Sequence, residues 1–391
     1  MFHANSLLLP FFNDEHRALH DSLHRWCRQH FTSRIHNGSV DLYCQKLVRQ
    51  LGDAGWLRYT VPAAYGGQLP EIDSRSLCLL RQTLGYYDGL ADFAFVMQGL
   101  GSGPITLFGS DELKAKYLPK VATGDYIAAF ALSEPDAGSD AAAMKTKATR
   151  TADGYLLNGV KTWISNAGIA DFYTVFARTE NDEAEGVTAF VVDANTPGLE
   201  ITERFDLAAP HPIGTLTFTN CYIPASQRLA QPGQGFKVAM QNLDVFRASV
   251  GAAALGFAEA ALDMAINHAS TRQMFGGVLS DLQITQAAIG DMSTEIDAAT
   301  LLVYRAAWER DVLKQRTTRS AAMAKLYATE SAQRIIDRSL QMFGGLGVRV
   351  GQPIEMLYRE VRALRIYEGA TEVQQVIIAR ETMKNKTGEA K

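Results

Sequence analysis

The sequence predicts an α+β fold in which helical N-terminal and C-terminal regions flank a central antiparallel β domain. Helical periodicity fills about residues 13–118, short β-type runs fill about 125–229, and long helical stripes return over about 233–385. The chain of 391 residues is long enough for two or three domains. We therefore place a helical domain at 1–118, a β domain at 119–229 and a four-helix-bundle-like domain at 230–391.

The N-terminal region contains two sets of apolar residues at three- and four-residue steps, which is the spacing of one helix face. The first set is Leu19, Leu23 and Trp26–Cys27, and the second is Leu47, Leu51 and Trp56. Gly52 and Gly55 are predicted to close the second helix. Val61–Gly67 indicates a loop because proline and paired glycines interrupt the pattern.

The central region changes to short apolar runs bounded by turn residues. Asp153-Gly154 stands between Lys145–Arg150 and Tyr155–Leu157, which is typical of a hairpin turn. No long helical pattern separates the runs, so they predict an antiparallel sandwich or barrel. The other runs are Tyr126–Leu132, Phe172–Ala177, Val187–Val192 and Thr215–Phe218.

The C-terminal region carries two long helical stripes that are rich in small residues. Small residues let helices approach closely, as they do in a bundle. The first stripe is Val250, Ala254, Phe257, Ala261 and Met264, and the second is Ile289, Met292, Ile296, Ala299, Val303 and Ala306.

Composition excludes several classes of function. The 38 basic and 42 acidic residues give a formal charge of −4, so no basic field is present to hold nucleic acid or a membrane surface. The run Leu7–Phe12 is too short to span a bilayer and lacks the features of a signal peptide. Cys27, Cys44, Cys78 and Cys221 form no C-x-x-C or metal-ligand pattern. We expect a cytoplasmic protein with buried free thiols and no metal, nucleic-acid partner or membrane insertion.

The loop Ser133–Asp140 is the most informative candidate site. Pro135 stops the preceding strand, and Gly138 permits a positive φ. Backbone N–H groups and hydroxyls in such a loop can bind the polar edge of a planar ring or a pyrophosphate. An ordinary turn built on Asp and Ser side chains explains the same residues equally well.

Three further segments combine polar side chains with aromatic residues or glycines. Trp163–Asn166 can pack on a flat cofactor and donate hydrogen bonds to it, although a core tryptophan at a strand end is the simpler interpretation. Arg272–Gly276 and Gln341–Gly347 place glycines beside long helices, where a backbone can approach a phosphate or another chain. None of these has the spacing of a Rossmann fingerprint or a P-loop.

Glu368 lies between apolar neighbours and directly before Gly369. We expect partial desolvation to raise the pKa of its carboxyl. A carboxylate with a raised pKa is a better general base near neutral pH. Taken alone, a glutamate in this position is more commonly a surface or helix-capping residue.

Taken together and in this order, the motifs resemble the acyl-CoA dehydrogenase family of flavoproteins over about residues 13–385. Each motif alone is moderately specific, whereas the set in the order and spacing of the family is highly specific. The matching segments are Gly124–Asp140, Asn158–Ser165, Gly235–Lys237, Arg272–Gly276, Gln341–Gly347 and Arg365–Gly369.

The resemblance implies FAD as the cofactor and assigns residues from all three regions to it. Trp163 would pack against the isoalloxazine, and Ser165 would lie near its N5 edge. The tail of FAD would be gripped by a neighbouring subunit, which implies a homo-oligomer, most simply a dimer of dimers. The full set is Phe130, Leu132, Ser133, Gly138, Ser139, Trp163, Ile164, Ser165, Arg272, Phe275, Gln283, Gln341, Gly344, Gly345, Ala370, Thr371 and Glu372.

The resemblance also implies the reaction. Glu368 matches the catalytic base, which removes the α-proton of an acyl-CoA while a β-hydride passes to flavin N5 and a 2,3-enoyl-CoA forms. The electrons would pass to an electron-transfer flavoprotein, in the degradation of a fatty acid or another carboxylic acid. The positions that match contacts with the CoA thioester, or that support them, are Ser139, Asp244, Arg247, Gly369 and Arg380.

Three positions bear on the details of this site. Some family members carry the base on another helix, at the position of Phe246, which cannot accept a proton. The usual Glu-Gly-Thr ends here in Ala370, so a hydroxyl is missing, and Thr371 stands one residue later. Leu207–Ile213 replaces a Gly-x-Arg-x-Ser segment, and we expect His211 within it to be a loop residue.

Two alternatives stay open. The first is a flavoenzyme of the same fold that acts on an acyl-carrier-protein thioester or uses oxygen as acceptor. The second is a helical scaffold without activity, which the intact segments Ser133–Asp140 and Trp163–Ser165 disfavour. The acyl group is not readable from sequence, because the pocket depth depends on several helices; the candidate pocket residues are Phe95, Val96, Leu243 and Phe246.

Overall fold

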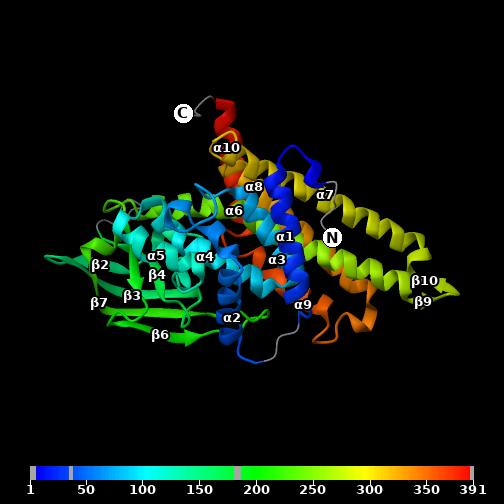
Figure 1. Ribbon diagram of the computed structural model, residues 1–391, viewed down its shortest axis with the longest axis horizontal. Coiled ribbons are helices and arrows are strands. Elements are labelled where there is room, and N and C mark those ends of the chain that lie inside the picture. The colour runs from blue at the N-terminus through cyan, green and yellow to red at the C-terminus, as the bar shows by residue number, and fades with distance from the viewer. Residues whose placement is uncertain (1–5, 35–37, 180–185, 388–391) are drawn as a thin grey trace. The chain divides into compact units, whose positions relative to one another are not determined.

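The computed structural model describes residues 6–34, 38–179 and 186–387 (Figure 1). They divide into two compact units, each assembled from separate stretches of chain. The first unit is Met1–Asn37, Ser74–Asp92 and Asp244–Lys391, and the second is Gly38–Asp73 and Phe93–Leu243. The helices are α1 (Asp14–His30), α2 (Val40–Asp53), α3 (Ser74–Tyr87), α4 (Gly89–Phe108), α5 (Asp111–Thr123), α6 (Gly235–Thr271), α7 (Gln283–Asp311), α8 (Thr318–Met342), α9 (Pro353–Leu364) and α10 (Thr371–Thr387).

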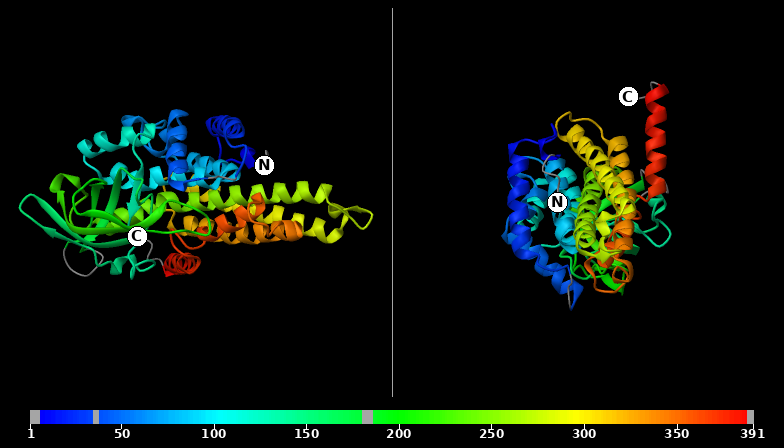
Figure 2. Two further views of the ribbon diagram at one scale, coloured as in Figure 1. Left: turned by 90° about the horizontal axis from the view of Figure 1, so that it is seen from below. Right: turned by 90° about the vertical axis from the view of Figure 1, so that its right-hand side faces the viewer.

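The first unit is a helical bundle whose core holds both predicted C-terminal stripes. The long helices α6 and α7 run side by side, joined by the short hairpin of β9 (Gln273–Met274) and β10 (Gly277–Val278) (Figure 2). Phe257 of α6, Val303 of α7 and Ala328 of α8 share one buried cluster. A Cβ at Gly256 would lie 2.1 Å from the Gln82 carbonyl oxygen, so α3 and α6 pack too closely there for any side chain.

The second unit is built on one large sheet with the strand order β6-β7-β3-β2-β4-β5-β8. Arg150 pairs with Tyr155, which confirms the hairpin predicted at Asp153-Gly154. Most pairs are antiparallel, as predicted, but β1 pairs with β4 in parallel, and so do the ends of β2 and β4. The strands are β1 (Ala128–Ala131), β2 (Lys147–Arg150), β3 (Gly154–Ser165), β4 (Phe172–Arg178), β5 (Val187–Asp193), β6 (Leu199–Arg204), β7 (Ile213–Pro224) and β8 (Arg228–Leu229).

Helix α5 and the C-terminal part of α4 cover one face of this sheet. Tyr117 and Val121 of α5 pack with Phe172 and Phe176 of β4 in a buried cluster. Ser110 caps the start of α5, and Gly124, with φ +72°, ends it. The α+β fold class predicted from the sequence is thus confirmed, with the large sheet in the second unit and a helical bundle in the first.

One predicted helix boundary was wrong. Helix α2 ends at Asp53, and Gly55 adopts a left-handed φ of +80°, so Trp56 begins a separate 3₁₀ turn over Trp56–Thr60. Gly52 does not close the helix but lies inside it. A Cβ at Gly52 would lie 2.1 Å from the Thr123 carbonyl oxygen, so this glycine serves the close packing of α2 on α5.

Candidate active site

Trp163 occupies a strained and exposed position on β3. Pairing between β3 and β7 is irregular between Lys161 and Ile164, and Trp163 within this bulge has φ +59°. Its indole stacks on Phe205 with ring centroids 4.5 Å apart, yet 57% of the residue is exposed. A large aromatic held outward in a left-handed conformation is a typical functional feature. Ile164 is buried and Ser165 is half-buried beside it.

The loop Ser133–Asp140 is anchored by a buried ion pair that the sequence analysis missed. The Lys161 ammonium donates to Glu134 Oε1 at 2.8 Å and to the Leu132 carbonyl at 2.9 Å. The Glu134 carboxylate also accepts from the backbone N–H groups of Lys145 and Thr146. Despite burial, which opposes ionisation, Lys161 and these N–H groups hold the pKa of Glu134 below its usual value. The available sequence signal was Lys161 itself, a lysine two residues before Trp163 in the Asn158–Ser165 segment.

The anchored loop leaves its tip open. Gly138 and Ser139 are exposed, and no atom lies within 4 Å of the place where a Cβ on Gly138 would stand. Gly138 does not have a positive φ. The absence of a side chain there therefore leaves room at the tip of the loop and is not required by the backbone conformation. Phe130, Leu132 and Ser133 are half-buried at the base of the loop. Space at the loop and an exposed indole fit a planar ring system bearing phosphates, as FAD does.

A second candidate group lies at one end of the helical bundle. His268 near the end of α6 stacks on Phe343 after α8, with ring centroids 4.2 Å apart, so the chain leaves both helices from one place. Phe275, at φ +49°, is 89% exposed at the hairpin tip, and Gly344 and Gly345 have open space around their Cβ positions. Arg272, Gln283 and Gln341 are exposed as well. These residues present an open polar and aromatic surface.

Glu368 lies in the turn between α9 and α10, in the first unit. Glu368 has φ +53° and Gly369 has φ +93°, so two consecutive residues are left-handed. The residue is half-buried, and its Oε2 is shielded from water with no hydrogen-bond partner among the described residues. Burial raises the pKa of Glu368, and Arg81, Lys325 and Arg247 partly oppose that rise. The desolvation expected from the sequence is present.

Two of these three cations already have a carboxylate partner. Arg81 is fully buried and forms a bidentate pair with Asp92, with both N···O distances at 2.9 Å. Arg247 is paired with Asp244 at 2.5 Å. The pair of Arg81 and Asp92 had no sequence signal, because its members lie on α3 and α4 without a helical spacing between them.

The remaining predicted residues of α10 are less enclosed. Glu372 and Arg380 are exposed, and Ala370 is half-buried. The Thr371 hydroxyl donates to Glu330 Oε1 at 2.6 Å, and Arg365 donates to the same oxygen. The proton of the Thr371 hydroxyl is therefore used inside the chain, where it joins the start of α10 to α8.

Phe246 and His211 take the positions expected of them. Phe246 is fully buried, and its phenyl ring offers no base. His211 packs on Phe93 with ring centroids 4.6 Å apart, in a segment without regular structure. The four cysteines are buried free thiols, as predicted.

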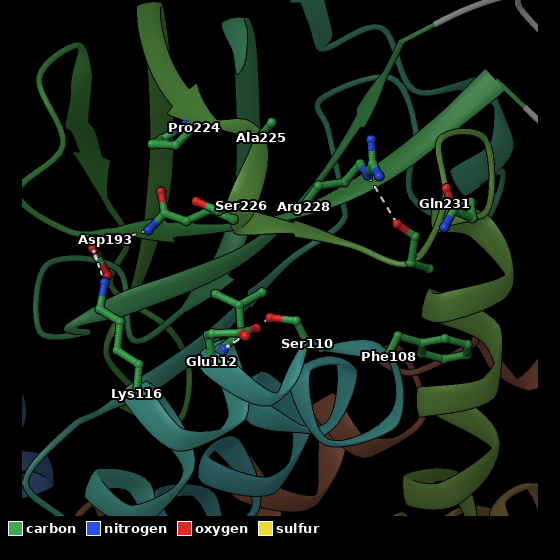
Figure 3. A pocket seen from close by; sticks show the side chains of 14 residues that line it. Phe108, Ser110, Glu112, Lys116, Asp193, Pro224, Ala225, Ser226, Arg228 and Gln231 are labelled. Carbon is green, nitrogen blue, oxygen red and sulfur yellow. Dashed lines mark hydrogen bonds and ion pairs between the residues drawn. The ribbon is translucent and has the colours of Figure 1, made fainter. Parts of the chain in front are cut away.

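A pocket of about 860 Å³ lies elsewhere in the second unit, between the start of α5 and the segment from β7 to β8 (Figure 3). Lys116 and Asp193 pair across it at 3.0 Å, and Arg228 donates to the Ala230 carbonyl. None of the predicted site residues lines it. We therefore assign the pocket no part in the site.

Comparison with known proteins places this geometry in a family. The acyl-CoA dehydrogenase N-terminal domain matches residues 13–125, the middle domain matches 129–221, and the C-terminal domain matches 233–383. The chain belongs to the acyl-CoA dehydrogenase family. It is thus an oxidoreductase that acts on acyl-CoA, and its cofactor is FAD. The human mitochondrial short-chain specific acyl-CoA dehydrogenase is 39% identical over 338 residues, which cover 85% of this chain and 81% of that protein.

Three solved structures show the same acyl-CoA dehydrogenase fold. Butyryl-CoA dehydrogenase from Megasphaera elsdenii has a TM-score of 0.89 and 32% identity, covering 95% of this chain and 99% of that one. A chain from the structure described as the electron transferring flavoprotein of Acidaminococcus fermentans has a TM-score of 0.88 and 33% identity, at the same coverage. PigA with FAD and proline has a TM-score of 0.87 and 28% identity, covering 95% of this chain and 98% of that one.

Proposed function

We propose that this acyl-CoA dehydrogenase uses Glu368 as the base that removes the α-proton of an acyl-CoA, giving the 2,3-enoyl-CoA. The observation that carries the proposal is the state of the Glu368 carboxylate. Its Oε2 is buried and makes no hydrogen bond within the described residues, so the oxygen is free to accept a proton. Burial also raises the pKa of this carboxyl, which increases its strength as a base.

The chain's own groups divide the work of proton abstraction. The Glu368 carboxylate takes the α-proton and becomes a neutral acid that the buried site accommodates. The backbone N–H of Glu368 makes no bond within the described residues and would donate to the thioester oxygen, where negative charge develops. FAD, when bound, supplies the acceptor for the β-hydride. Trp163, Ser165 and the Ser133–Asp140 loop would hold its ring system and phosphates.

We further propose that the protein works as a homo-oligomer, a dimer of dimers. Phe275, Ile284, Val348 and Val350 are each more than 65% exposed, close in sequence to the candidate residues Arg272, Gln283 and Gln341. Large apolar side chains gathered on a surface mark an interface. In this arrangement Arg272, Phe275 and Gln341 of one subunit hold the FAD tail of another.

The remaining roles rest on the relatives. An electron-transfer flavoprotein is the proposed electron acceptor, and its association with one of the similar structures supports this choice. Butyryl-CoA is the first substrate to test, because relatives in sequence and in structure are named for short-chain and butyryl thioesters. We place the enzyme in the cytoplasm, since 83% of the most apolar stretch of α6 is buried inside the protein and its thiols are free.

An anaerobic titration of the purified yellow holoenzyme with acyl-CoAs tests the proposed reaction. We expect one class of thioester among short, long, branched, cyclic and aryl compounds to abolish the flavin absorbance. A flavin that no CoA thioester reduces would contradict the proposal and favour a carrier-protein thioester. That outcome has precedent in the similarity, at a TM-score of 0.87 and 28% identity, to a structure described as the prolyl acyl carrier protein oxidase AnaB.

Replacing Glu368 by glutamine tests the base. The amide keeps the shape and removes the proton acceptor, so we expect turnover to fall by about 10²–10⁴-fold with FAD content unchanged. Steady-state rates and the flavin-to-protein absorbance ratio measure both effects. Glu200→Gln, which makes the same exchange at an exposed position of β6, should keep full activity. Near-normal turnover in Glu368→Gln would exclude Glu368 as the base.

A further inference from the structure

The turn that carries Glu368 is held by a lysine that lies outside all the motifs found in the sequence. Lys325 of α8 is fully buried, and its ammonium donates to the Gly369 carbonyl at 2.7 Å. Gln374 of α10 donates to the same carbonyl at 2.9 Å and to the Glu368 carbonyl at 3.3 Å. Two donors thus converge on one carbonyl oxygen in the left-handed turn.

The close fit of this turn shows that these bonds determine its shape. A Cβ at Gly369 would lie 2.3 Å from Gln374 Nε2, so the residue after the base must be glycine for Gln374 to reach the backbone. Glu368 itself holds a φ of +53°, which non-glycine residues rarely adopt. Such a conformation persists only where the surroundings impose it. Lys325 and Gln374 supply that restraint from two different helices.

Lys325 also differs from the other cations around the base. Arg81 is neutralised by Asp92, and Arg247 is paired with Asp244. The ammonium of Lys325 makes its hydrogen bond to a neutral carbonyl, and the described residues give it no salt bridge. A buried charge is normally paired. Glu330, another nearby carboxylate, is already bonded by Arg365 and Thr371, so Glu368 is the counter-charge left for Lys325.

We propose that Lys325 is the positioning residue of the base: its ammonium fixes the Glu368–Gly369 turn, and its unneutralised charge keeps the Glu368 carboxylate ionised. This inference rests on the proposed role of Glu368. The charged groups that face Glu368 are Arg81 of α3, Asp92 of α4, Arg247 of α6 and Lys325 of α8. The pKa of Lys325 is lowered by burial to about 8, so its charge is present at neutral pH.

Two matched variants separate the effect of the Lys325 charge from the effect of the hydrogen bonds that hold the turn. Lys325→Met removes a hydrogen bond and the charge, whereas Gln374→Met removes two hydrogen bonds and no charge. We expect both to lower kcat, on the order of 10²-fold, because the base is displaced. Only Lys325→Met should move the acid limb of the kcat/KM profile to higher pH, since loss of the cation favours the neutral carboxyl. Lys325→Gln keeps a donor without the charge and should move the same limb if Lys325→Met does not fold.

Proton exchange provides a readout apart from turnover. The holoenzyme is incubated anaerobically with butyryl-CoA in D₂O, or with the thioester that best reduces the flavin, and α-deuterium uptake is followed by mass spectrometry. We expect slower uptake in Lys325→Met, recovered in part at higher pH. Unchanged uptake and an unchanged acid limb would overturn the role of Lys325, as would identical profiles for Lys325→Met and Gln374→Met. Undiminished uptake in Glu368→Gln would instead overturn the proposed base itself.

Discussion

At the scale of single residues, the groups proposed for chemistry have strained backbones, unpaired polar atoms or exposed apolar surface. Glu368 is left-handed, has a buried oxygen without a partner and carries a raised pKa. Trp163 is left-handed and exposes a large aromatic surface. Each feature costs folding free energy of about 1–3 kcal/mol where it involves strain. Such costs are typical of functional positions, where a ligand and not the fold completes the interactions.

The raised pKa of Glu368 predicts how stability depends on pH. Because the folded-state pKa lies above the unfolded value, the stabilising contribution is complete at low pH and is lost as pH rises through the folded pKa. Glutamine has no charge to desolvate, so the melting temperature of Glu368→Gln relative to that of the natural protein should rise with pH. Thermal unfolding from pH 5 to pH 8 measures the difference, which should widen with pH. A constant difference across that range would show that ionisation of Glu368 is not its cause.

At the scale of elements, the bulge in β3 lets one strand present a buried lysine and an exposed tryptophan two residues apart. Lys161 points into the unit and holds Glu134, while Trp163, two residues later, is exposed. In a regular strand these two side chains would share one face. The bulge between Lys161 and Ile164 breaks that alternation. One strand can therefore anchor the Ser133–Asp140 loop from within and present an aromatic ring outside.

Lys161→Met should destabilise the protein by about 3–5 kcal/mol, because it leaves the buried Glu134 carboxylate without its cation. It should also loosen the Ser133–Asp140 loop and reduce the FAD retained after gel filtration. Urea unfolding measures the first effect. Lys147→Met, at an exposed position of neighbouring β2, is the matched control and should change little. The double variant Lys161→Met/Glu134→Gln should regain part of the loss; no recovery would argue against a cost from unpaired charge.

At the scale of the whole molecule, we propose that a second copy of the chain completes the site. The hairpin β9–β10 and the turn after α8 present Phe275, Gly344 and Gly345 to open space. No described residue of the first unit covers Phe275, which is 89% exposed. A second copy holding an FAD tail would bury these residues, which is why assembly and cofactor binding are expected to be coupled.

Arg272→Ala should weaken FAD retention more than proton abstraction, because Arg272 lies at the proposed tail site and not beside Glu368. Flavin occupancy after gel filtration and the rate of α-deuterium uptake, measured with FAD added back, separate the two. Light scattering of the same fractions should give a multiple of 42.8 kDa. Arg316→Ala removes an exposed arginine between α7 and α8 and serves as control. Full flavin occupancy in Arg272→Ala would contradict the shared site.

Much of the fold could be predicted because it is encoded locally. The stripes of α6 and α7 and the hairpin of β2 and β3 follow from periodicity and turn chemistry over short stretches. The prediction was wrong for Trp56, where a left-handed glycine ends α2 and only packing against α5 explains Gly52. The parallel pairing of β1 with β4 was also missed, because pairing partners far apart in sequence leave no local signal.

The sequence by itself determined the order of helices and strands, the family motifs, and Glu368 as the candidate base, since each depends on residue type and short spacing. Only the tertiary structure decided how that base is surrounded. Arg81, Arg247 and Lys325 come from α3, α6 and α8, and only their folded positions show which carboxylate neutralises which cation. The physical reason is that desolvation and Coulomb interactions depend on distances between atoms, and the fold alone fixes those distances.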